Sequence, residues 1–176
     1  MTEEQALARL SRSISMVKSP GFLPATATAR SDGSSVARLY ILSSCDDGGG
    51  CITVCASDTA ARIDIAQMGS SMPGLARRFG VDLGGRPLEV DRARLFLGRL
   101  REHGAWELPD CLPNCIDGFG CIHVVADGDL EHCIILDNPD AHINPAYIEI
   151  INEYSQLMGC GSVLKWEGDR APRIDM

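Results

Sequence analysis

A short turn between two apolar segments constrains this chain more than any other feature of its sequence. The segment Cys121–Leu136 contains two runs rich in apolar and β-branched residues, joined by Ala126-Asp127-Gly128-Asp129. Asp-Gly is a preferred dipeptide of two-residue type I′ turns, which connect adjacent antiparallel strands. The sequence therefore predicts a β-hairpin over 121–136, with Asp127-Gly128 as its loop.

Helical periodicity flanks this hairpin on both sides. Between 90 and 103, apolar residues recur at spacings of three and four, and Gly104 follows where helices commonly end. A second apolar stripe runs from 145 to 158, behind the helix-starting pair Asn144-Pro145 and before Gly159. We expect these two helices to cover one face of the sheet that contains the hairpin.

Further strands are predicted at Val36–Ser43 and Cys51–Ala56, on either side of a glycine-rich turn. Weaker patterns indicate strands at 13–17 and 25–30 and around 63–65, and one or two helical turns within 72–79. Glycine and proline between 69 and 87 predict irregular structure there. The expected fold class is α+β, an antiparallel sheet of about five to six strands in hairpins with two main helices on one face.

The chain length sets the expected domain organisation. A length of 176 residues fits one domain spanning 1–176. Residues 1–10 and the tail 168–176 are predicted to be loose, although a short helix can begin near Glu3.

The charge balance excludes some classes of partner. The formal net charge is -8, and no cluster of Lys and Arg interrupts it. Such a protein repels phosphate backbones, so nucleic acid is not expected as a partner. The sequence also lacks an apolar run long enough for a membrane span, and its N-terminus does not resemble a signal peptide. These observations predict a cytoplasmic protein without a membrane partner.

Signatures of common enzymes are missing. The run Gly48-Gly49-Gly50 lacks the Lys-Ser/Thr of a phosphate-binding loop, and no serine lies in a Gly-x-Ser-x-Gly motif. Most aspartates fall at predicted turns, where turn geometry explains them. A non-catalytic role is therefore favoured, and Cys–His pairing is the catalytic combination that composition leaves open.

Cysteine number and spacing form the one unusual chemical pattern. The chain has 8 cysteines and 4 histidines. With Asp127-Gly128 as the loop, His123 pairs with His132, and Cys121 lies on the same face of the hairpin. Thiolate and imidazole are zinc ligands, so we expect a candidate metal site whose donors are Cys111, Cys115, Cys121, His123 and His132. Two alternatives remain: a buried core in which the histidines are neutral, and disulfides, which require an oxidising compartment.

Two functions follow from these patterns. The first is a non-catalytic protein-interaction module, such as an acidic inhibitor or immunity-type protein whose charge attracts a basic partner protein. The second is a Cys/His protein that binds zinc or iron or carries out thiol redox chemistry.

Overall fold

The structure is a computed structural model that describes most of the chain. It covers residues 1–13, 34–43, 49–68, 83–111, 119–137, 143–160, 164–165 and 173–174. Three expected elements lie outside these residues, namely the strand at 25–30, the strand at 13–17 beyond Ser13, and the helical turns within 72–79. So does the tail expected at 168–176, apart from its residues 173–174.

An antiparallel sheet of six strands forms the centre of the molecule, in the order β4-β3-β2-β1-β5-β6. Its strands are β1 (Ser35–Ser43), β2 (Gly49–Ala56), β3 (Ala61–Met68), β4 (Gly84–Leu88), β5 (Phe119–Asp127) and β6 (Leu130–Asp137). Strands β1 to β4 follow one another as a meander, and β5 returns to pair with the free side of β1. A separate small ladder joins β7 (Leu164–Lys165) to β8 (Arg173–Ile174).

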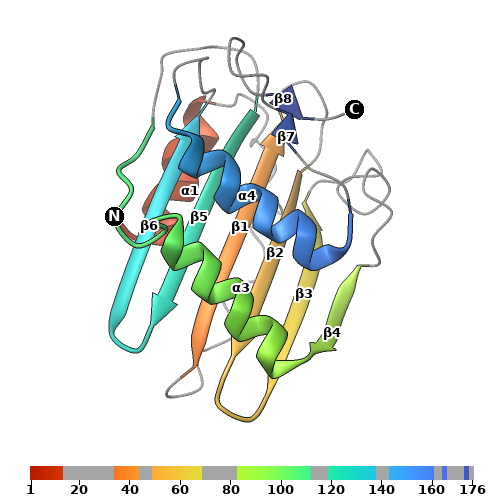
Figure 1. Ribbon diagram of the computed structural model, residues 1–176. Coiled ribbons are helices and arrows are strands. Elements are labelled where there is room, and N and C mark those ends of the chain that lie inside the picture. Colours follow the sequence, from red (N-terminus) through yellow and green to blue (C-terminus); the bar gives the residue numbers. More distant parts are fainter. Residues whose placement is uncertain are drawn as a thin grey trace.

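Two helices cover one face of this sheet, as Figure 1 shows. They are α3 (Val90–Glu102) and α4 (Pro145–Met158), at the positions where the sequence periodicity predicts helices. The Asn144 side chain accepts a hydrogen bond from the Ala146 amide, and Gly159 ends α4 in the left-handed conformation with φ of 76°. The expected α+β class, with an antiparallel sheet and two main helices on one face, is confirmed.

The two faces of the sheet bury different clusters. Toward α3 and α4, inward residues of five strands meet Phe96, Leu100 and Ile150 in the larger core. On the other face, Ala6 and Leu7 of α1 (Glu3–Ser13) belong to a smaller cluster with strand residues such as Ile122. This alternation of side chains between faces follows from the period of two in every strand.

Two expectations for peripheral segments are wrong. Residues 1–10 are not loose, because the apolar side of α1 lies against β5 and β6 and buries Ala6. Irregular structure was expected up to residue 87, yet 84–88 form the edge strand β4. An edge strand tolerates Pro87 because only one side of it needs hydrogen bonds.

The hairpin register also differs from the prediction. The loop residues are Gly128 and Asp129, so Asp127 pairs with Leu130, and His123 faces Ile134 instead of His132. Gly128 adopts a left-handed φ of 56°, which turns of this kind require. Asp127 stays in the strand because its carboxylate accepts a hydrogen bond from the Ser35 hydroxyl at 2.9 Å and pairs with Arg101 of α3. The two histidines keep a common face, because the shift moves the pairing by an even number of residues.

Candidate functional site

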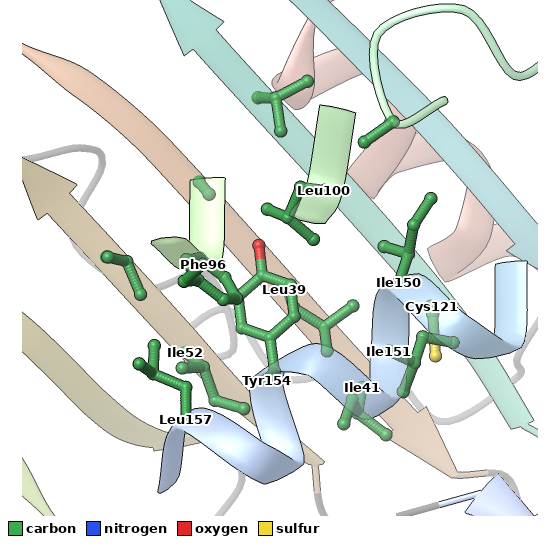
Figure 2. Packing of buried hydrophobic residues seen from close by; sticks show 14 of the residues in the cluster. Leu39, Ile41, Ile52, Phe96, Leu100, Cys121, Ile150, Ile151, Tyr154 and Leu157 are labelled. Carbon is green, nitrogen blue, oxygen red and sulfur yellow. The ribbon is translucent and has the colours of Figure 1, made fainter. Parts of the chain in front are cut away.

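Strand β5 directs a thiol and an imidazole toward α4. Cys121 and His123 alternate with Ile122, so both side chains lie on the face that the two main helices cover. Both are buried, and His123 is 4% exposed. Figure 2 shows Cys121 beside Ile150 and Ile151 of α4. The Cys121–His123 pair is therefore an interior feature of the larger core.

The His123 ring has no polar partner within the described part of the chain. Neither Nδ1 nor Nε2 makes a hydrogen bond, and the same is true of the nearby Tyr154 hydroxyl. The two rings meet edge to face, with centroids 5.6 Å apart. Each buried polar group without a partner destabilises the fold by about 1–3 kcal/mol, so such groups call for an explanation.

Burial determines the protonation of both members of the pair. It lowers the pKa of His123 to about 3, with a smaller contribution from His132, so the imidazole is neutral. It also raises the pKa of the Cys121 thiol well above its usual range. A thiolate–imidazolium nucleophile is therefore not favoured at this position.

A small cavity lies beside the pair. Its volume is about 10 Å³, which is enough for roughly one water molecule. Cys121 and His123 line it together with Leu39 and residues of β6 and α4, namely Ile134, Leu136, Tyr147, Ile150 and Ile151. Apart from Cys121, His123 and Tyr147, the residues that line the cavity are aliphatic.

The other expected metal ligands occupy different positions. His132 lies on β6, the other strand of the hairpin, and its Nε2 lies 2.9 Å from the Leu108 carbonyl oxygen. Cys111 forms a bridge at the outer edge of β6, where its amide donates to the Ile135 carbonyl. Cys115 lies outside the described residues. Within the part of the chain that the structure covers, no group of three or more His, Cys, Asp or Glu is arranged to hold a metal ion.

Four other thiols show no sign of activation. Burial raises the pKa of Cys51 to about 11 and that of Cys133 to about 12, and it also raises the pKa values of Cys55 and Cys160. A redox-active or nucleophilic cysteine requires the opposite shift. Cys51, Cys55, Cys121, Cys133 and Cys160 are not joined in disulfides.

A buried polar cluster on the opposite face was not expected from the sequence. The α1 polar cluster consists of Glu3, Arg38, Tyr40 and Thr53. Glu3 pairs with the Arg38 guanidinium and accepts a hydrogen bond from the Tyr40 hydroxyl, while Arg38 Nε donates to Thr53 Oγ1 at 3.0 Å. These groups satisfy one another, so the cluster fastens α1 to the sheet. A charged residue between apolar neighbours in β1 was the signal that could have revealed it.

The third feature is an open groove between the two main helices. The α3–α4 groove is lined by Arg92, Leu95, Phe96, Arg99, Glu153, Gln156 and Leu157 and has a volume of about 150 Å³. Leu95, which lines this groove, is 59% exposed. Arg99 contacts Glu153 at 3.4 Å and donates to Gln156 Oε1 at 3.0 Å.

Comparisons with protein-family models, with curated proteins and with solved structures found no match for this chain. Function therefore has to be argued from the site geometry.

Proposed function

We propose that this chain is a non-catalytic protein-interaction module that holds an apolar side chain of a partner protein in the α3–α4 groove. The observation that carries the proposal is Leu95, which is 59% exposed at a groove of about 150 Å³. A volume of about 150 Å³ accommodates a benzene-sized group, so the groove fits one aromatic or branched aliphatic side chain. Binding energy in protein interfaces is concentrated on such anchored apolar side chains.

The charge distribution supports a basic partner. Arg99 is compensated by Glu153 within the groove, and the adjacent Arg94 contacts Asp91 at 3.5 Å. Arg92, which also lines the groove, donates a hydrogen bond to the Leu157 carbonyl oxygen, and the net charge of -8 acts at longer range. It would steer a positively charged protein toward this surface, as expected for an inhibitor or immunity-type protein.

Site-specific photo-crosslinking tests where a partner docks. A photoreactive amino acid is placed at position 95 in the groove or, as a matched control, at Leu130, which is 69% exposed at the start of β6. In cells of the source organism we expect a discrete protein adduct from position 95 and none from position 130. The same adducts from both positions, or none from position 95, would contradict the proposal.

The crosslinked partner then allows a quantitative test. With the purified pair, Leu95→Ala should weaken binding by about fivefold or more, because an anchoring contact is worth over about 1 kcal/mol. The association rate should fall steeply with added salt, since salt at 0.1 M screens charges that lie more than about 10 Å apart. An association rate that is indifferent to salt would contradict the basic partner, and unchanged affinity in Leu95→Ala would contradict the groove.

A second candidate function, that of a Cys/His protein, is supported by one specific observation. The unpartnered imidazole of His123 lies with Cys121 at the same cavity, which favours a bound ion over thiol redox chemistry. The raised pKa values of Cys51, Cys121 and Cys133 weigh against a redox nucleophile at these thiols.

A further inference from the structure

Two potential metal donors meet at one cavity inside the core. Cys121 and His123 are neighbours on the inward face of β5, and both line the cavity of about 10 Å³ beneath α4. Neither nitrogen of the His123 ring is used by the protein, although the residue is buried. A buried imidazole without a partner beside a thiol points to a ligand that binds both groups.

The apolar wall of the cavity restricts the charge of that ligand. Leu39, Ile134, Leu136, Ile150 and Ile151 surround the donors. A net charge in such surroundings is strongly unfavourable unless it is compensated. The complex formed by the ion and its ligands should therefore be close to neutral.

Zinc does not meet this condition with the donors present. Zn²⁺ requires four ligands, and one thiolate with one neutral imidazole would leave a net positive charge and two open positions. Cu(I) is monovalent and soft and prefers thiolate donors. One thiolate and one neutral imidazole give Cu(I) a two-coordinate, uncharged complex.

We propose that Cys121 and His123 form a two-coordinate site for Cu(I) in the cavity beneath α4. Binding replaces the thiol proton of Cys121, which leaves as H⁺ to solvent, and one His123 nitrogen donates its lone pair to the ion. The copper stays in the Cu(I) state, so no electron is transferred and no oxidant or reductant takes part. This inference is independent of the α3–α4 groove and of any partner protein.

The binding experiment uses the full chain under anaerobic conditions. Cu(I) is titrated in competition with a coloured Cu(I) chelator, for the native protein and for Cys121→Ala and His123→Leu. Loss of a direct ligand should lower the affinity by at least about 100-fold, since removal of groups that merely orient ligands already costs 10–100-fold.

A cysteine on the other face of the sheet provides the matched control. Cys133 is also buried, but it belongs to the smaller cluster with Ala6 and Leu7. Cys133→Ala should bind Cu(I) like the native protein. Equal loss in Cys133→Ala and Cys121→Ala would overturn the proposal, because copper would then be responding to thiols in general.

X-ray absorption of the copper-loaded native protein decides the coordination directly and does not depend on variants that fail to fold. The site predicts one sulfur and one imidazole nitrogen around the copper. Coordination by sulfur alone, or no retained copper after chelator competition, would overturn the proposal.

Discussion

Two buried polar groups, one on each face of the central sheet, differ in whether they have partners. Under α1, the ion pair of Glu3 and Arg38 is joined by Tyr40 and Thr53, and each group has a partner within the chain. Under α4, the His123 nitrogens and the Tyr154 hydroxyl have no partner among the described residues. A satisfied network holds two elements together, whereas unsatisfied groups destabilise the fold until something binds them. The difference separates a structural cluster from a candidate ligand site.

Breaking the satisfied face should produce the largest effect. Arg38→Met removes the guanidinium and leaves the Glu3 carboxylate without its buried counter-ion. We expect the free energy of unfolding to fall by about 3 kcal/mol, the lower end of the range for a broken buried pair, because Glu3 is partly exposed. Urea denaturation followed by circular dichroism measures this loss.

The control for that change lies on the same helix. Arg9 of α1 is 54% exposed and lies 3.9 Å from Asp110, so Arg9→Met should change stability by less than about 1 kcal/mol. Similar losses in both variants would mean that burial of the Arg38 pair adds nothing, and the contrast between the faces would fail.

The unsatisfied face predicts a pH dependence. Burial holds the pKa of His123 near 3 in the folded protein, whereas an unfolded histidine titrates near 6.5. Between these values the unfolded chain binds a proton that the folded chain does not, so stability falls as the pH is lowered from about 6.5 toward 3. The contribution of this one group is about 1.4 kcal/mol per pH unit.

A variant isolates this contribution from the carboxylates that also titrate in acid. Between pH 6.5 and 5, the free energy of unfolding of His123→Leu should fall less steeply than that of the native protein, by up to about 1.4 kcal/mol per pH unit. Parallel stability curves for the two proteins would show that the imidazole titrates normally and is not held neutral.

A smaller effect separates charge from hydrogen bonding on the α1 face. Glu3→Gln keeps an acceptor for Arg38 and Tyr40 but removes the negative charge, so we expect a loss of about 1 kcal/mol. Glu4→Gln is the matched control, because both acids lie in the first turn of α1 and interact similarly with the helix dipole. Equal losses in the two variants would assign the effect to the dipole and not to the buried cluster.

Elements with strong local patterns were predictable. The hairpin, α3 and α4 follow from residue spacing and end signals, because these depend on neighbours in the sequence. The exact register of the hairpin was not predictable, because Ser35 and Arg101, which are distant in the sequence, keep Asp127 in the strand. The strand β4 was missed because Gly84-Gly85-Arg86-Pro87 has none of the apolar alternation that marks a half-buried strand.

The candidate site was predictable only in part. The period of two in a strand places Cys121 and His123 on one face, and this holds in the structure. Tyr154 and the cavity depend on where α4 docks, and the α3–α4 groove depends on how the two helices pack. Such tertiary relations leave no local pattern in the sequence, so neither the unpartnered ring nor the groove could be foreseen.

The central contrast is tested most directly by the stability of metal-free His123→Leu at pH 7. Leucine fills similar space without polar atoms, so the unsatisfied nitrogens disappear while the packing stays. We expect the free energy of unfolding to rise by about 1–2 kcal/mol relative to the native protein, opposite in sign to Arg38→Met. A fall of about 2 kcal/mol or more would show that His123 makes stabilising hydrogen bonds, and it would contradict the claim that this face leaves its polar groups for a ligand.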